Sequence, residues 1–343
     1  MPITASTLRH MRALVVDLDE VIDRSISELA RAYGSAWDAV SGQLLAALLD
    51  LADEPITATR VQRSSRIASA LQVIADQLDQ LAAQSAVVIT DAAGQVTSIS
   101  VAAQAAIAGS QLPAAGYPLV SVNPDVVGSI IARTSQNITA RTRPLAQAGQ
   151  VAVRTALIQG TSASDNPVKV ARNMARLARQ GGVDLPLARA TAIARTELLD
   201  AGRSAQHAWD QANASTLQGW EWLSSRSKTT CAACWSRDGS IHELSEPGPN
   251  DHVCGRCTRM VRTKTWAELG IDLPEPEGLA RISAEDHFRS LPQEQQLKIM
   301  GPARLKALDD GAAWSDLAVL KHNPDWRSSW QVRPVRDLVR MGA

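Results

Sequence analysis

The sequence predicts a mainly α-helical protein of several parts, with a small β domain that carries cysteines, and three observations lead to this fold class. Apolar residues recur every three or four positions over the first 50 residues, which is the period of an amphipathic helix. Aromatic residues make up only 3%, so the core must be mainly Ala, Leu, Val and Ile, a mix that favours packed helices. All four cysteines and eight of the nine tryptophans lie beyond residue 200, where a different domain is therefore expected.

Residues 1–84 are expected to form a long helical hairpin. One apolar stripe covers residues 11–48 and a second covers residues 67–81, so the two helices should pack antiparallel. Gly34 and Gly42 weaken the first stripe and allow a break in it. Without a break, a helix of ~40 residues would reach roughly 60 Å, which favours an elongated protein.

Residues 85–125 are expected to form a β-hairpin and a linker. Residues 86–101 contain a β-branched run, then Asp91-Ala92-Ala93-Gly94, then a second apolar run, which is typical of two strands joined by a turn. Glycines and prolines between residues 109 and 118 indicate the linker.

Residues 126–218 are expected to form a basic helical body. The net charge of the chain is zero, but residues 126–196 hold ten basic and two acidic residues, whereas residues 1–125 hold seven basic and 13 acidic residues. Ser164-Asp165-Asn166-Pro167 is typical of a helix start, and Gly181-Gly182 of a helix end. A further helix should run from about Pro186 through Trp209.

Three arginines of this body, Arg172, Arg176 and Arg179, are spaced to share one helix face. Such a face is either a solvated surface or a candidate contact to nucleic-acid phosphates, which would be salt-dependent and independent of sequence. Four basic residues within or just after the second cysteine pair are further phosphate candidates: Arg256, Arg259, Arg262 and Lys264.

Residues 219–268 contain the sharpest chemical signal of the chain. Cys231 and Cys234 form one Cys-x-x-Cys pair, and Cys254 and Cys257 form a second one after 19 intervening residues. This spacing predicts a zinc-ribbon-like site with four thiolate ligands and one structural zinc ion. His252 is a candidate substitute for one cysteine, while free thiols and disulfides remain alternatives. Residues 269–343 are expected to form a helical C-terminal tail.

The rest of the composition limits the setting. The sequence shows neither an apolar run of the ~20 residues that span a bilayer nor the basic and apolar segments of a secretory signal, so no membrane partner is expected. We expect the chain to fold in a reducing cytoplasm, where cysteines more often bind metals than form disulfides.

An ordered set of motifs resembles the phage Mu F-like head morphogenesis family, the minor head proteins of tailed bacteriophages. The resemblance covers roughly residues 150–320. It rests on Gly160 before the helix from Pro167, Arg195-Thr196-Glu197, Gly219-Trp220-Glu221-Trp222, the two Cys-x-x-Cys pairs with His252, and the segments from Leu291 to Gln296 and from Met300 to Gly311. One departure is the closing motif, because the family usually has Cys-x-Cys where this chain has Cys254-Gly255-Arg256-Cys257.

The resemblance implies a low-copy virion protein inside the phage head that acts in capsid assembly near the portal. It implies the portal protein, the major capsid protein or both as partners, and packaged double-stranded DNA as a further contact. Members of the family are not generally enzymes, so no catalytic residues or substrate cofactors are expected here. Arg195 and Glu197 match the family signature, but we interpret them as ion-paired residues that brace their helix against the cysteine domain, and Trp220, Trp222 and Trp235 as core residues.

Two other functions compete with this interpretation. One is a zinc-containing DNA-binding module without catalysis, which is compatible with a place inside the head. The other is a nuclease of the His-Asn-His type, in which His252 would be the general base. Only Val253 separates His252 from Cys254, and His287, His322 and Asn323 lie far along the chain, so the nuclease pattern fits poorly.

Overall fold

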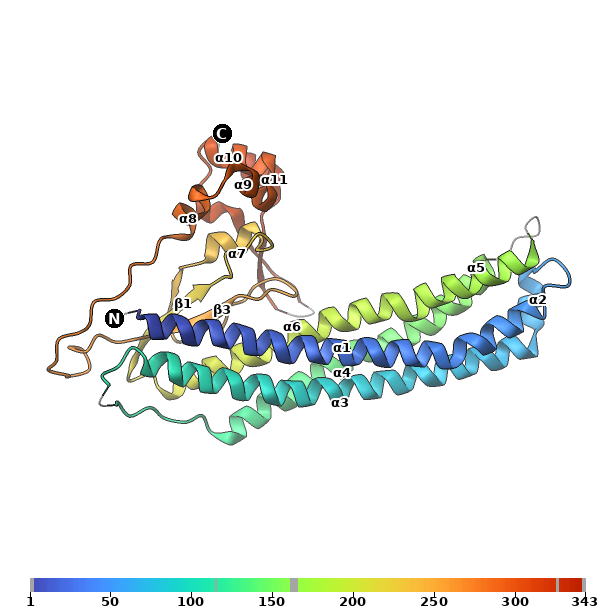
Figure 1. The fold of residues 1–343 in the computed structure, drawn as a ribbon, viewed down its shortest axis with the longest axis horizontal. Helices are drawn as coiled ribbons and strands as arrows, with labels where there is room; N and C mark the ends of the chain where they lie inside the picture. The colour runs from blue at the N-terminus through green and yellow to red at the C-terminus, as the bar shows by residue number, and fades with distance from the viewer. Residues whose placement is uncertain (1–2, 115, 161–165, 325–326, 341–343) are drawn as a thin grey trace. The chain divides into compact units, whose positions relative to one another are not determined.

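The computed structural model describes residues 3–114, 116–160, 166–324 and 327–340 and shows a mainly helical chain (Figure 1). It divides into two compact units, each assembled from separate segments. The helical unit comprises Asp19–Gln95 and Ile131–Leu198, and the cysteine unit comprises Met1–Leu18, Val96–Ile130 and Leu199–Ala343. Four long helices contribute residues to both units, so the division does not follow the order of the sequence.

Six helices supply the helical unit. They are α1 (Ala5–Leu49), α2 (Ala58–Arg63), α3 (Ser65–Gly109), α4 (Pro124–Gln159), α5 (Pro167–Arg179) and α6 (Leu185–Ala212). Within this unit, α1 and α3 run side by side as the expected hairpin (Figure 1). Their apolar stripes meet α4, α5 and α6 in one core, in which Leu44, Leu48 and Val153 are fully buried. Gly34 and Gly42 lie inside an unbroken α1, because packing of the stripe outweighs the helix cost of two glycines.

The β-hairpin expected at residues 86–101 is wrong, because α3 continues through this segment as one helix. The reason lies in the spacing of its buried side chains. Ile89, Ala92 and Val96 are almost fully buried, whereas Val87 is 63% exposed. Buried positions three and four residues apart form one helix face, whereas a strand would bury every second residue. The tertiary core thus overrides the β preference of Val87-Val88-Ile89-Thr90.

The helix stop expected at Gly181-Gly182 is also wrong. α5 begins at Pro167 after the N-cap Asn166, as expected, while Ser164 and Asp165 lie outside the described residues. At the other end of α5, Gln180–Asp184 form a π-helical turn that leads directly into α6. A Cβ atom on Gly182 would lie 2.4 Å from a Val153 side-chain carbon, so the glycine allows this turn to pack closely on α4. The glycines therefore serve helix contact rather than helix termination.

The cysteine unit contains a three-stranded antiparallel sheet. Its strands are β1 (Leu217–Leu223), β2 (Ile241–His242) and β3 (Thr258–Thr263), in the order β2-β1-β3. The short helix α7 (Ala232–Arg237) lies between β1 and β2 in the chain. Trp220, Trp222 and Trp235 are almost fully buried, which confirms them as core residues.

The segment after residue 269 is not purely helical. It contains the short helices α8 (Ala284–Ser290), α9 (Gln293–Met300), α10 (Pro302–Asp309) and α11 (Val335–Val339), a 3-10 turn at Trp314–Leu317, and the two-stranded sheet of β4 (Ala318–Lys321) and β5 (Ser329–Val332). Phe288, Leu317 and Leu338 pack with Trp235 in one core, which ties the tail to α7 (Figure 1). The expected helical tail is therefore corrected by the β4–β5 pair.

Among the described helices, α3 is long and apolar enough to span a membrane by those two measures, and 33% of the residues in its most apolar window are buried. Core helices of helical bundles meet the same two criteria. Length and composition alone therefore assign no membrane segment.

Candidate metal centre

The first Cys-x-x-Cys pair lies at the start of α7. Cys231 is the N-cap residue, and its sulfur accepts a hydrogen bond of 3.4 Å from the backbone N–H of Cys234. Cys234 is buried, whereas Cys231 is partly exposed. This turn directs both sulfurs to the same side of the chain, which is what a metal knuckle requires.

The loop of residues 251–257, which leads into β3, carries the other candidate ligands. The backbone N–H of Gly255 donates to the carbonyl of His252 at 2.8 Å, which closes a tight turn. The Nδ1 atom of His252 lies 2.8 Å from the carbonyl oxygen of Val253 and must be its donor. The Nε2 atom of the imidazole is therefore the nitrogen left to bind a metal.

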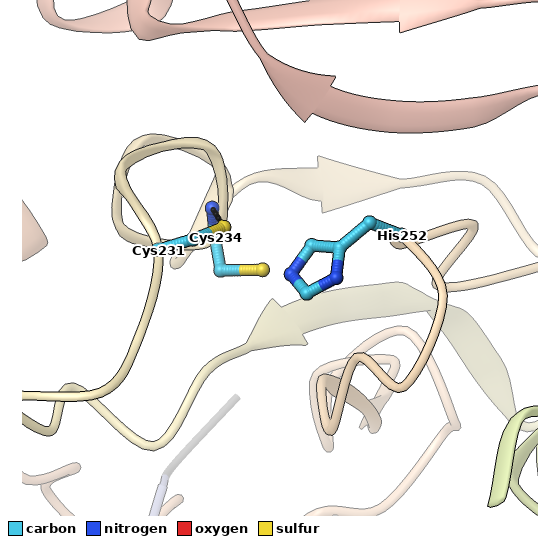
Figure 2. Close-up of side chains that lie close together, drawn as sticks. All are labelled: Cys231, Cys234 and His252. Atoms are coloured by element: carbon cyan, nitrogen blue, oxygen red, sulfur yellow. Dashed lines mark hydrogen bonds between the residues drawn. The ribbon is translucent and has the colours of Figure 1, made fainter. Parts of the chain in front are cut away.

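Cys231, Cys234 and His252 converge. One ligand atom from each residue lies within 4.8 Å of the others, and the imidazole ring points toward the two cysteines (Figure 2). Cys257 packs against Cys234 in the same buried cluster. Cys254 belongs to neither group in the described residues, and its backbone has a positive φ of 59° within the tight turn. The structure therefore brings the expected substitute His252 together with Cys231 and Cys234, while the full set of four cysteine ligands stays a prediction.

The three side chains of the cluster shift one another's pKa values. Hydrogen bonding from the Cys234 thiol, and then from His252, lowers the pKa of Cys231 to about 4 although burial opposes the shift. The hydrogen bond to Cys231 raises the pKa of His252 to about 9. The pKa of Cys234 is raised by its hydrogen bonds to Cys231 and Cys257 and by burial. The cluster thus holds a thiolate beside an imidazolium, with a nearby thiol that a divalent cation would deprotonate.

A buried arginine holds the ligand loop in place. Arg203 of α6 donates to the carbonyl oxygens of Gly255 at 2.8 Å and Cys257 at 2.7 Å. Its guanidinium also contacts both carboxylate oxygens of Asp251, at 2.8 and 2.9 Å. Asp251 in turn accepts from the backbone N–H of Cys257 at 3.0 Å. We refer to Arg203 and Asp251 as the staple, because together they fix the backbone on both sides of the turn.

The charges of the staple are tightly balanced. Burial alone would lower the pKa of Arg203, but Asp251 and Asp200 raise it overall. Burial raises the pKa of Asp251 against the opposing effect of Arg203. Arg327 adds a second cation, since it donates to the backbone carbonyl of Asp251 at 3.1 Å and to the Asp200 carboxylate at 2.9 Å. The sequence offers one signal of this network, which is the position of Asp251 directly before His252.

Gly255 is required by this packing. A Cβ atom at this position would lie 2.2 Å from an Asp251 carboxylate oxygen and 2.8 Å from the His252 carbonyl. The carboxylate cannot move aside, because Arg203 and the Cys257 N–H both hold it. The glycine between the two cysteines of the second pair therefore makes room for the staple.

A second polar chain in this unit joins Ser240, His242 and Glu246. The Nε2 atom of His242 lies 2.9 Å from the Ser240 hydroxyl, and Nδ1 lies 2.9 Å from the Glu246 carboxylate. This order resembles that of a nucleophilic triad. However, the Ser240 hydroxyl donates to the Arg237 carbonyl at 2.7 Å, and the Arg237 guanidinium lies 3.1 Å from Nε2 and donates to it. The Nε2 lone pair of His242 thus already accepts a hydrogen bond from Arg237. These hydrogen bonds join β2 to α7.

The predicted phosphate contacts divide into two groups. Arg172, Arg176, Arg179 and Arg256 are exposed. Arg259 is fully buried, pairs with Asp210 at 2.7 Å and stacks over Trp220, so its expected phosphate contact is wrong. Burial raises the pKa of Asp210 to about 6 against the opposing charge of Arg259. The remaining two are engaged within the unit, since Arg262 lies 3.9 Å from Glu221 and Lys264 donates to the Ser215 carbonyl at 2.7 Å.

The residues Arg195, Thr196 and Glu197 lie on α6 within the helical unit. Arg195 pairs with Asp23 of α1 at 2.7 Å, and the buried Glu197 pairs with Arg141 of α4. The Thr196 hydroxyl donates to the Ala192 carbonyl at 2.7 Å. These are the expected bracing ion pairs, but the described contacts brace α6 against α1 and α4 rather than against the cysteine domain.

Fold and site together define a class of protein: a mainly helical chain with a small β domain that bears a Cys/His cluster. Residues 150–260 match the model of the family described as Phage Mu protein F like protein. The match contains the Arg195–Glu197 signature, both cysteine pairs and His252. Over these residues the chain is therefore similar to phage Mu F-like proteins, and this similarity indicates a part in phage head morphogenesis. No curated protein and no solved structure matches the chain.

Proposed function

We propose that this chain is a minor head protein of a tailed phage, located inside the head and acting near the portal during assembly in the host cytoplasm. The observation that carries the proposal is the family match over residues 150–260. The partners that fit this role are the portal protein, the major capsid protein or both. The role is one of assembly and requires no catalysis by the chain.

Quantitative mass spectrometry of purified procapsids and mature particles tests this proposal. A few copies per particle in both forms are expected for a minor head component. Presence in procapsids alone would instead indicate an assembly factor that leaves the particle. Absence from both would contradict the proposed role.

We also propose that the cysteine unit holds one structural zinc ion. The donor set fits, because a thiolate, a second thiol and an imidazole nitrogen lie within 4.8 Å of one another. Cys257 packs in one buried cluster with Cys234 and would be the fourth ligand. When bound, zinc would supply a fixed junction between α7 and the loop before β3, held by Cys231, Cys234 and His252. The staple would hold the loop in the geometry that these ligands need.

Hydrogen exchange with and without a zinc chelator tests the structural role. Because the binding energy of such a site is local folding energy, chelation should speed exchange over residues 219–268 and leave α1 and α3 protected. Equal exchange in both conditions would contradict a structural zinc ion.

The exposed arginines of α5 support DNA contact as a further part of the role. Arg172, Arg176 and Arg179 form a row on this helix, and Arg179 also lies 3.5 Å from Asp184. Phosphate contacts release counterions, so the affinity for double-stranded DNA should fall steeply with salt. Changing Arg172 and Arg176 to Gln should reduce the slope of log affinity against log salt by about one per residue. An unchanged slope would contradict contact through this row.

The alternative of a His-Asn-His nuclease receives no support from the described geometry. His252 faces the cysteines, His287 meets Trp235 edge to face, and His322 contacts the Ser328 hydroxyl. These side chains therefore have separate surroundings within the described residues. Nicking of plasmid DNA that requires metal and is lost on His252→Ala would restore the nuclease proposal.

A further inference from the structure

The helical unit carries an apolar groove between α4 and the segment from α5 to α6. The groove has a volume of about 680 Å³ and its apolar lining includes Pro144, Ala148, Val151, Ala152, Leu177 and Leu185. Val151 and Leu185 are 59% and 58% exposed. A contiguous apolar surface of this kind is typical of a docking site.

The groove has a basic rim. Arg143 and Arg154 are exposed on α4, where helix periodicity places them beside Gln147 and Val151 of the lining. On the other side, Arg176 is exposed one turn before Gln180 of the lining. A fitting occupant is therefore a helix with an apolar face and acidic neighbours.

The chain itself displays such a helix face on α3. Val73, Ala83 and Val87 are exposed on one stripe, and Asp76 and Asp91 share that stripe. Residues 67–109 contain no Lys, Arg or His. We call residues 73–91 on this face the acidic stripe.

The groove and the acidic stripe also match in length. Residues 144–159 of α4 span ~22 Å along the helix axis, and residues 73–91 of α3 span ~27 Å. Both surfaces are exposed in the same chain, so they do not cover each other. We propose that the groove of one chain binds the acidic stripe of a second copy.

This contact joins two different surfaces, so it is heterologous. A pair formed in this way leaves one groove and one stripe open, and further copies can add until a ring closes or a filament grows. Association should therefore depend on protein concentration and weaken with salt, because charge pairs at the rim are exposed to solvent.

Disulfide trapping between chains tests the orientation. A mixture of Val87→Cys and Val151→Cys chains should form a crosslink between these two positions, identified by mass spectrometry of peptides. Val16→Cys is the matched control, because Val16 of the cysteine unit is 62% exposed and Val87 is 63% exposed. Crosslinks confined to two Val151→Cys chains would overturn the proposal, since they would show a symmetric contact instead.

Sedimentation velocity tests the charges. Exchanging Asp76 and Asp91 for Lys should weaken association at least tenfold, and mixing these chains with an Arg143→Glu/Arg154→Glu variant should restore it. The Asp17→Lys chain is the control, because Asp17 is exposed but lies outside the stripe. A wild-type chain that stays monomeric at high concentration, or a loss of association that charge exchange does not rescue, would overturn the proposal. Docking of a different acidic protein into the groove of such a monomer would also overturn it.

Discussion

Replacing Arg203 by Met removes the cation of the staple while keeping a side chain of similar length. In the folded chain, Arg203 contacts both carboxylate oxygens of Asp251 and donates to the carbonyls of Gly255 and Cys257. The Asp251 side chain is only 1% exposed. The variant therefore leaves a buried carboxylate next to two carbonyl groups that have lost a donor.

The expected cost follows from that burial. Removing one partner of a buried ion pair destabilises a protein by about 3–5 kcal/mol, because the remaining charge is left uncompensated. Weakening the support of metal ligands lowers metal affinity by about 10–100-fold. Arg203→Met should therefore destabilise the cysteine unit by about 3–5 kcal/mol and lower its zinc affinity by at least about tenfold.

Urea unfolding followed by tryptophan fluorescence measures the change, since eight of the nine tryptophans lie beyond residue 200 and report on the cysteine unit. Lys298→Met is the control within the same unit. Lys298 pairs with Glu294 at 2.7 Å, but both side chains are more than half exposed. Loss of this pair should cost only about 0.3–0.5 kcal/mol.

A double variant separates the staple from general damage to the unit. The double variant Arg203→Met/Asp251→Asn removes both charges. Its loss of unfolding free energy should therefore be about 2 kcal/mol smaller than the summed losses of the two single variants. A cost below about 1 kcal/mol for Arg203→Met, or strictly additive single changes, would refute the staple as the support of the ligand loop.

Three further predictions concern the cysteine unit. Gly255→Ala should lower zinc affinity at least about tenfold by displacing Asp251, as measured by chelator competition. Zinc binding at neutral pH should release protons from Cys234 and His252. Calorimetry in buffers of different ionisation enthalpy counts the released protons, and His252→Asn should release one proton fewer than the wild type. The pKa of Asp210 is raised to about 6, so the folded chain loses stability as this carboxyl ionises. The free energy of unfolding of the wild type, minus that of Asp210→Asn, should therefore fall by about 2–3 kcal/mol between pH 4 and pH 7 in urea titrations. A difference that does not change with pH would contradict this.

Much of the helical fold could be predicted from the sequence, because helix periodicity is a local signal. The stripes at residues 11–48 and 67–81 correspond to α1 and α3, and the Asn166-Pro167 start of α5 is also observed. The segment of residues 86–101 misled the prediction because β-branched residues and a glycine look like a hairpin. Its helical state depends on packing that involves Ile89 and Val96, which are fully buried in α3.

The site was only half predictable for a related physical reason. The Cys231–Cys234 knuckle is local, so its spacing was sufficient. The place of His252 beside this knuckle depends on a tight turn, and that turn depends on Arg203, which precedes Asp251 by 48 residues. Arg259 likewise looked like a surface cation until its buried partner Asp210 was located. A single sequence does not show which residues far apart in the chain form such ion pairs.

Native mass spectrometry of the chain, purified without chelators, tests the central claim about the metal centre most directly. The structure predicts one zinc ion per chain for the wild type and for Cys254→Ser. It predicts loss of the ion for Cys231→Ser, and for His252→Ala at low zinc concentration. A metal-free wild-type chain, or loss of zinc on Cys254→Ser with retention on His252→Ala, would contradict the Cys231, Cys234 and His252 site.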